Sequence, residues 1–531
     1  MLVEAMRENP VVAIAAPRPD FAGALQEFLI GLLSVALRPE TERDWREIWN
    51  EPPTAPALQS SFDELPDAFS LDGDGPRFFQ DLSSLEFIDV TPRCADQLLI
   101  DAPGDQGIRQ NKDLFVKRGR VERMGRPAAA MALVTLQTYA PAGGQGHRTS
   151  LRGGGPLTTL IEPRGDPHAE LGAEAQPLWN KLWANVQSAT QWSNQNSSDV
   201  DGPHLIFPWL SATRVSDPQS GRPTTPHDAH PLQGYFGLPR RIRLDFDGAG
   251  KCDITGLEDT VTVPRFRMLN YGVQYQAWMH SLSPYYRAKD ASEWLPVHAQ
   301  PGGVGWRDWV GLTLSVPDAN REPAKVISAF GQRIDAFGPT QARLHAFGYD
   351  MDNMKARGWA EGTLPLFSVI DPDARLFMAD VATGLTQGTD MAASVVLGSV
   401  KRALFQRSED APGDLSAVRL AVWRATEDAF FFCIGEVAAA GVNIEAANAG
   451  RRQFTKNLQS AAIEIFDRWC PAESASPTTL RRLVAARFSL VMTLTGYSKL
   501  GEKLFTTLGV PAPPKAQSKK ISKSKPKGPH T

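Results

Sequence analysis

Three consecutive glycines, Gly153, Gly154 and Gly155, stand between two arginines and an apolar run. Glycine has no Cβ and adopts positive φ readily, so this backbone can closely approach another backbone or the edge of a base. Glycine-rich turns often bind anions through their N–H groups, and Arg148 and Arg152 add positive charge on both sides. The glycines equally suit a tight turn that leads into a strand. Their spacing matches neither a P-loop nor a dinucleotide-binding fingerprint.

A second group of residues is a basic stretch between positions 109 and 126, which carries seven cations against two acids. Phe115 stands among these cations, and basic residues interleaved with an aromatic suit a single-stranded nucleic-acid backbone and a stacked base. A solvated loop is the alternative interpretation of such a charge run. The cations are Arg109, Lys112, Lys117, Arg118, Arg120, Arg123 and Arg126.

Acidic and histidine residues offer a catalytic alternative, a metal-dependent nuclease or hydrolase. Asp350 and Asp352 begin a segment that resembles a calcium loop, but the glycine and distal glutamate of an EF-hand are missing. His227 and His230 have no third metal ligand near them in the sequence. The sequence contains no nucleophile elbow and no H-E-x-x-H motif. It therefore favours binding over catalysis and indicates no cofactor.

The composition indicates the cellular compartment and limits how the protein could contact nucleic acid. The chain has 531 residues and a net charge of −3, so any contact with nucleic acid must come from local basic patches. Its four cysteines are scattered without a C-x-x-C pair, which favours a reducing compartment. The sequence shows no signal peptide and no apolar run of membrane-spanning length. We therefore expect a cytoplasmic protein.

The elements that position these groups indicate an α+β fold. A large, irregular, mixed α/β domain is expected over 1–379, and its clearest helix spans 21–37, where Asp20 can cap the N-terminus. Leucines and Phe28 form the expected apolar face of this helix. A polar loop is expected over 187–231. Short strands are expected at 132–139, 157–161, 242–246 and 260–266.

The chain changes character after about residue 380. Four helical patterns follow one another with short connections, and this arrangement predicts a four-helix bundle over 380–510. A Lys-rich tail over 511–531 has too few apolar residues to form a core and is expected to be disordered. The four patterns run over 390–406, 414–440, 445–469, and from Ser476 to a point before Gly509.

The glycine segment resembles the glycine loop of the large subunit of the type I-E CRISPR surveillance complex, the CasA subunit of Cascade. Further matching motifs follow in the same order as in that family, and this collinear order is more specific than any single motif. They are RPDF at 18–21, QEFLIGLL at 26–33, RFFQ at 77–80, NKDLF at 111–115, PRRIRL at 239–244, WMHSLSP at 278–284 and GYDMDNMKAR at 348–357.

The resemblance implies a noncatalytic subunit of an antiviral defence complex, with a C-terminal helical bundle. Such a subunit recognises the protospacer-adjacent motif (PAM) in double-stranded DNA, promotes duplex opening and R-loop formation, and helps to recruit a helicase-nuclease. Its other implied partners are the remaining Cascade subunits and the 5′ handle of the guide RNA. Family members usually begin with a short β-containing segment before the RPDF motif, so we expect the N-terminus to be truncated or its start codon to be misassigned.

The resemblance also assigns roles to individual residues. Gly154 aligns with the glycine that lies against the minor groove, and Arg267 aligns with a basic residue that contacts the PAM, where other members have lysine. An ordinary surface arginine on a strand is the alternative for Arg267. The implied DNA-binding residues are Gly153, Gly154, Gly155, Arg267, Asn353, Met354 and Lys355, of which the last three form a wedge. The implied docking residues for guide RNA and complex are Asn111, Lys112, Phe115, Lys117, Arg118 and Arg120.

Two departures from the family pattern stand out. Some members have Gln and Ala where the wedge of this chain has Met354 and Lys355, although an unbranched apolar side chain suits intercalation. Some members also carry a cysteine cluster near the position of Cys252. This cysteine stands alone here, so we expect no zinc site.

Overall fold

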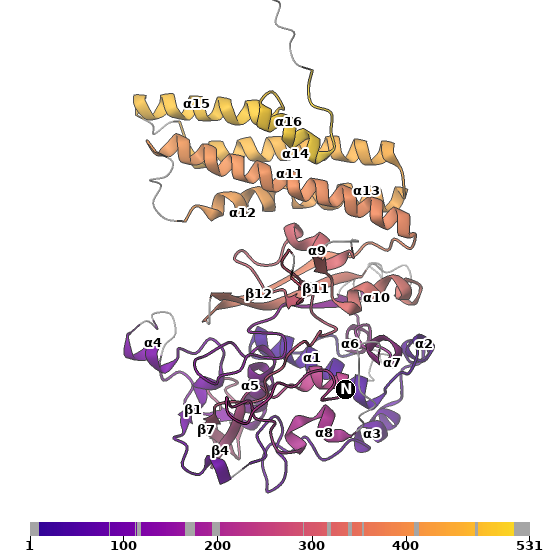
Figure 1. Ribbon diagram of the computed structural model, residues 1–531, viewed down its shortest axis with the longest axis vertical. Coiled ribbons are helices and arrows are strands. Elements are labelled where there is room, and N and C mark those ends of the chain that lie inside the picture. Colours follow the sequence, from indigo (N-terminus) through magenta and orange to yellow (C-terminus); the bar gives the residue numbers. More distant parts are fainter. Residues whose placement is uncertain are drawn as a thin grey trace, which may run out of the picture. The chain divides into compact units, whose positions relative to one another are not determined.

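The computed structural model describes residues 10–83, 85–111, 113, 118–164, 176–193, 202–289, 291–315, 320–337, 342–352, 355–407, 414–472 and 476–514. The chain divides into two compact units, Met1–Ile370 and Asp371–Thr531 (Figure 1). The first unit mixes helices and strands, whereas the described part of the second contains only helices. The predicted α+β class with a C-terminal helical bundle is therefore confirmed.

The first unit combines short helices, one long helix and small antiparallel sheets. Its helices are α1 (Pro19–Ala36), α2 (Glu42–Asn50), α3 (Ala55–Asp63), α4 (Asp105–Arg109), α5 (Arg126–Tyr139), α6 (Leu178–Trp183), α7 (Ala189–Ser193), α8 (Pro203–Ile206), α9 (Trp309–Thr313) and α10 (Lys325–Arg333). Its strands are β1 (Arg93–Cys94), β2 (Met124–Gly125), β3 (Thr158–Glu162), β4 (Arg241–Asp247), β5 (Gly250–Lys251), β6 (Glu258–Asp259), β7 (Thr262–Leu269), β8 (Tyr285–Tyr286), β9 (Leu295–Pro296), β10 (Arg321–Glu322), β11 (Arg343–Asp352) and β12 (Lys355–Pro365).

Two of the sheets position the candidate site. In one sheet, β7 pairs with β1, β2 and β4, and the other has the order β12-β11-β3. Strand β3 directly follows the glycine loop and pairs with β11, so that Thr158 lies opposite Phe347. The pairing brings the glycine loop beside the part of β11 that leads into the β11–β12 hairpin turn (Figure 1).

The strand predicted over 132–139 is wrong, because these residues belong to α5. Pro127 occupies the first turn of this helix, where its missing N–H costs nothing. Most of the helix is buried, and it packs against α1. A helix buried on nearly all sides presents a continuous apolar run, which periodicity alone cannot distinguish from a buried strand.

Helix α1 forms as expected, but its buried face and its cap differ from the prediction. Asp20 lies inside the first turn and Arg18 is the N-cap residue. The buried face includes Phe21, Ala24 and Glu27, whereas Phe28 is only half-buried. The buried face of α1 therefore contains glycines and a paired carboxylate, which allow close packing. A pattern of apolar residues alone does not identify this face.

The described helices of the second unit lie side by side and form a bundle (Figure 1). Helix α11 packs against each of the others, as a bundle requires. The polar residues Thr389 and Ser399 are buried in its core face. The helices are α11 (Pro372–Leu404), α12 (Ser416–Ala425), α13 (Glu427–Ala440), α14 (Ile444–Trp469), α15 (Pro477–Leu494) and α16 (Lys499–Leu508).

The predicted helix boundaries in this unit need three corrections. Helix α11 begins at Pro372, well before residue 390. Gly388 in its first half lets α16 approach closely, because a Cβ there would collide with Leu508. The second pattern breaks at Thr426 and the fourth at Gly496, whose φ is +84°. Asp371 accepts a hydrogen bond from Ala374 N and caps α11. The helical unit therefore starts before residue 380, the boundary expected from the sequence.

The Lys-rich tail cannot be compared with its prediction. Residues 515–531 lie outside the described part of the chain, and the segment before them, 511–514, forms neither helix nor strand. Among the described helices, none is both long enough and apolar enough to cross a membrane.

Candidate nucleic-acid interface

The glycine loop turns sharply between α5 and β3. Gly153 and Gly155 have φ of +82° and +64°, which residues with side chains rarely adopt. Gly154 does not, but a Cβ there would lie 3.0 Å from Cα of Pro141. A Cβ at Gly155 would lie 2.8 Å from Cγ of Met351, two residues before the hairpin turn. The structure therefore brings the glycine loop and the hairpin together, and Gly153 and Gly154 stay partly exposed.

Arg152 does not add charge to the outside of the loop, contrary to expectation. Its side chain is 3% exposed and forms an ion pair with the buried Glu27 of α1. Its Nη1 donates hydrogen bonds to the hydroxyls of Thr158 and Ser283, each at 2.9 Å. The Tyr139 hydroxyl also donates to Glu27, and burial beside that carboxylate raises the pKa of this tyrosine well above its usual value. Arg152 therefore anchors the loop to the core.

Arg148, on the other side of the glycines, is also engaged within the protein. Its Nε donates to the Ser216 hydroxyl at 2.7 Å, and its Nη2 donates to the carbonyl of the same residue at 2.6 Å. The guanidinium lies 5.6 Å from the ring centre of Tyr271, a distance at which cation–π attraction operates. Neither arginine that flanks the glycines is therefore a free surface cation.

The implied wedge residues belong to the β11–β12 hairpin. Asn353 and Met354 lie outside the described residues, whereas Lys355 opens β12 and is exposed. Before the turn, Asp350 accepts a hydrogen bond from Arg357 of the opposite strand at 2.7 Å. This ion pair braces the hairpin next to the position of the wedge.

Arg267 of β7 makes several contacts with the protein itself. Its Nε donates to Asp245 of β4 at 3.1 Å, and its Nη1 donates to three carbonyls in the segment 87–90. Arg265, two residues earlier on the same strand, is exposed and has no partner among the described residues. Arg267 therefore has fewer donors free for DNA than the sequence led us to expect.

One arginine of the basic stretch, Arg118, is also engaged within the protein. Arg118 forms an ion pair with Asp113, in which Nη2 donates at 2.7 Å, and this contact lowers the pKa of the carboxyl. The same Nη2 lies 3.1 Å from Oδ1 of Asn111. Arg120 is exposed and has no partner in the described ranges. Three further implied docking residues lie outside the described part of the chain: Lys112, Phe115 and Lys117.

The residues of the enzyme alternative do not converge on a metal site. Asp350 and Asp352 both lie within 4 Å of Arg357, at 2.7 and 3.8 Å. Nδ1 of the buried His230 accepts the backbone N–H two residues ahead, while His227 is exposed. Within the described ranges, no group of three or more His, Cys, Asp or Glu residues could hold a metal ion.

Asp20 and Glu27 of α1 hold the glycine loop and the β11–β12 hairpin in place, a role that was not predicted from the sequence. The Tyr349 hydroxyl donates to Asp20 at 2.6 Å, and a Cβ at Gly155 would lie 2.8 Å from Cβ of Tyr349. Glu27, two turns further along α1, binds Arg152 of the glycine loop. One face of α1 thus ties down both the loop and the hairpin. The available signal was a pair of acids seven residues apart in an otherwise apolar helix.

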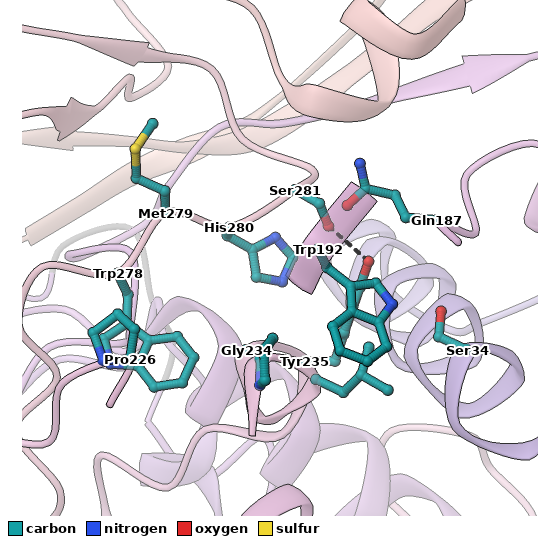
Figure 2. Close-up of a pocket in the computed structure, with 12 residues that line it drawn as sticks. Ser34, Gln187, Trp192, Pro226, Gly234, Tyr235, Trp278, Met279, His280 and Ser281 are labelled. Carbon is teal, nitrogen blue, oxygen red and sulfur yellow. Dashed lines mark hydrogen bonds between the residues drawn. The ribbon is translucent and has the colours of Figure 1, made fainter. Parts of the chain in front are cut away.

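A small cavity lies beside α1 and the segment 278–281, as Figure 2 shows. Its volume is about 40 Å³. Nδ1 of the buried His280 accepts the N–H of Leu282, while Nε2 has no partner among the described residues. Burial keeps the pKa of this histidine well below its usual value. The hydroxyls of Tyr235 and Ser281 are bonded to each other at 2.8 Å. The cavity has room for ordered water and is too small for a nucleotide.

Comparisons with solved structures agree with this architecture. CasA from Thermus thermophilus has a TM-score of 0.63 and 17% sequence identity, covering 92% of this chain and 94% of that chain. Cse1 from Thermobifida fusca has a TM-score of 0.66 and 16% identity, covering 94% of this chain and 92% of that chain. A chain of a CRISPR RNA-guided surveillance complex has a TM-score of 0.59 and 16% identity, covering 90% and 92% respectively. At these identities, the likeness establishes the fold.

Sequence comparison establishes the family. No curated protein matches significantly. The family of the CRISPR-associated protein Cse1 matches residues 1–465, which is most of the chain. The resemblance seen in the sequence is thereby confirmed: the chain belongs to the CRISPR-associated Cse1 family, also called CasA, the large subunit of type I-E Cascade.

Proposed function

We propose that this chain is the noncatalytic subunit that recognises the PAM in double-stranded DNA for a type I-E surveillance complex. The backbone of Gly153 and Gly154 lies against the minor groove, and the wedge at 353–355 enters the duplex beside the motif. Opening the duplex there lets the guide RNA pair with the target strand and form an R-loop. In RNA-guided systems the protein reads the short motif, and base pairing reads the remaining sequence.

One observation carries this proposal: the glycine loop and the hairpin, far apart in the sequence, are in contact at Gly155 and Met351. A backbone without side chains suits the minor groove, which is only about 6 Å wide. The described strand that leads to the hairpin turn lies beside the glycine loop, which supports a role for the wedge in parting the base pairs next to the motif. Because the minor groove distinguishes mainly A·T from G·C pairs, we expect partly degenerate motif reading.

The partner surfaces follow from the same proposal. The basic stretch 109–126 docks on the 5′ handle of the guide RNA and on neighbouring Cascade subunits, and Arg120 supports this role because it is exposed and unpaired among the described residues. After the target is engaged, the subunit helps to recruit a helicase-nuclease. The protein acts in the cytoplasm, where guide RNA and invading DNA meet.

Gly154→Leu in the assembled complex tests the proposal. The added side chain should impair binding of a duplex with the correct motif, and a pre-opened target should partly restore it. Because a Cβ at Gly154 already lies close to Pro141, the melting temperature is measured in parallel. Gly75→Leu is the control, since Gly75 is exposed, has no positive φ, as is the case for Gly154, and a Cβ there would meet no atom within 4 Å. Full duplex binding by Gly154→Leu, or binding loss that only parallels stability loss, contradicts the proposal.

A further inference from the structure

Arg240 is a buried cation that has no carboxylate partner among the described residues. It lies immediately before β4 and is 5% exposed. Its Nη2 donates to the carbonyl of Pro141, but its Nη1 has no hydrogen-bond partner among the described residues. Burial and the nearby positive charge of Arg93 lower the pKa of Arg240 to about 10. An uncompensated buried charge is costly, so its presence calls for an explanation.

Two further basic groups lie near Arg240. Arg93 on β1 and Leu244 on β4 both lie opposite Phe266 of β7, so β1 and the strand that follows Arg240 flank the same strand. His147 follows Gly146, whose carbonyl accepts the N–H of Tyr271 just beyond β7. Burial, followed by the charges of Arg240 and Arg93, lowers the pKa of His147 to about 4.

The neighbouring arginines show that this arrangement is unusual. Arg241, the next residue, forms a buried ion pair with Asp81 at 2.5 Å. Arg240 instead holds Pro141, the residue whose Cα would meet a Cβ on Gly154. Arg240 thus lies directly behind the turn on which the glycine loop rests.

We propose that Arg240, Arg93 and His147 form a binding site for a backbone phosphate of the duplex that lies against the glycine loop. Arg93 and His147 are partly exposed and give access, and Arg240 lies behind them. A phosphate supplies the negative charge that the folded protein lacks here, and guanidinium groups bind phosphate through charge-assisted hydrogen bonds. This inference rests on the proposed function, because the glycine loop is what brings the duplex to the site.

Arg240→Gln and Arg93→Gln test the site in the assembled complex. Gln at position 240 keeps an N–H for the Pro141 carbonyl while removing the charge. Each variant should weaken duplex binding roughly tenfold or more, as expected for loss of a hydrogen bond between charged groups. Each should also flatten the dependence of log K on log[salt] by about 0.9, the value for one lost B-DNA phosphate contact. Arg222→Gln, which removes an exposed charge elsewhere on this unit, should change neither quantity.

The melting temperature of each variant distinguishes a phosphate-binding site from a cluster that only stabilises the fold. Because each variant removes one of two like charges, its melting temperature should be unchanged or higher while binding weakens. Unchanged affinity and salt slope in both variants, or parallel loss of stability in both, overturns the inference. Duplexes with and without the motif are compared, since phosphate contacts carry no sequence information and both should weaken equally. A wild-type complex that does not distinguish these duplexes overturns the proposed function instead.

Discussion

Most arginines near the candidate interface serve the protein's own architecture. Arg152, Arg148 and Arg267 each donate several hydrogen bonds to groups within the chain. Their combined effect is to fix the glycine loop and its surroundings before any ligand arrives. Lys355 and Arg265 remain as exposed cations on the strands nearby. A rigid backbone surface with few free charges suits recognition by shape, which is what a minor-groove reader needs.

Glu27→Gln should destabilise the first unit strongly. The change leaves Arg152 as a buried charge without its counter-ion, a loss that costs about 3–5 kcal/mol. Urea unfolding followed by tryptophan fluorescence measures the difference. Glu47→Gln is the matched control, because its ion pair with Arg43 is exposed and joins residues four apart on α2, a contact worth about 0.3–0.5 kcal/mol. Equal effects of the two substitutions would contradict an anchoring role for Glu27.

Acid should destabilise the protein through histidines that remain neutral in the folded state. The pKa of His147 falls from 6.5 to about 4 on folding, so above 6.5 both states are neutral and this group contributes no pH dependence. Between these values the unfolded chain binds the proton and the folded chain does not, so stability decreases as the pH falls. His280 and His298, whose pKa values are also lowered by burial, add to the same trend.

Urea unfolding across this pH range, compared between wild type and His147→Gln, checks the prediction. The variant should lose less stability than wild type between pH 6.5 and about 4. His227→Gln, a substitution of an exposed histidine, is the control and should follow the wild-type curve. An identical pH slope in His147→Gln and wild type would contradict a neutral state for this histidine in the folded protein.

Local signals in the sequence were sufficient for some elements and misleading for others. Strands β3, β4 and β7 were found because β-branched residues alternate between turn-forming clusters. Helix α5 was mistaken for a strand because burial on nearly all sides removes the helical period. The first half of α11 was missed, and Gly388 within it admits a packed neighbouring helix. These errors share one cause, since burial by a distant element leaves no local pattern.

The candidate site could be found in the sequence by its glycines, but its internal contacts could not. No spacing indicates that Arg152 turns inward to Glu27 or that Arg267 binds Asp245, because each partner comes from another element. Nor does the sequence distinguish Arg240, which lacks a carboxylate, from Arg241, which has one. Distinguishing anchoring cations from free ones requires the packed structure.

The basic stretch should affect association with the guide-RNA complex more than it affects the fold. Arg120→Glu is a clean test because this residue is exposed and unpaired among the described residues, whereas Arg118 holds the local turn through Asp113. Association measured against salt should weaken, and its salt dependence should flatten by about 0.7, the single-strand value for one phosphate contact. Arg118→Glu should additionally lower thermal stability. Unchanged association of Arg120→Glu would leave the stretch as a solvated surface.

The molecule consists of two units that are built from different kinds of elements. The first gathers short elements from distant parts of the sequence around Asp20 and Glu27 of α1, so its site depends on many long-range contacts. The second is a bundle formed by one continuous segment of the chain, in which α11 packs against each of the other helices. A compact unit with its own buried core can fold independently, so the second unit is the part expected to fold alone.

A fragment spanning 371–514 should fold by itself, whereas one spanning 390–514 should not. The shorter fragment starts at the helix boundary expected from the sequence and removes the first half of α11, including the buried Val381, Leu385 and Gly388. That half packs against α16, where Leu508 fills the space beside Gly388, so its loss exposes apolar surface on both helices. Far-UV circular dichroism and thermal melting should show a helical, cooperatively unfolding 371–514 fragment and a weakly structured 390–514 fragment. A disordered 371–514 fragment would contradict the division into units, and equal stability of the two fragments would show that the early turns of α11 contribute nothing to the bundle.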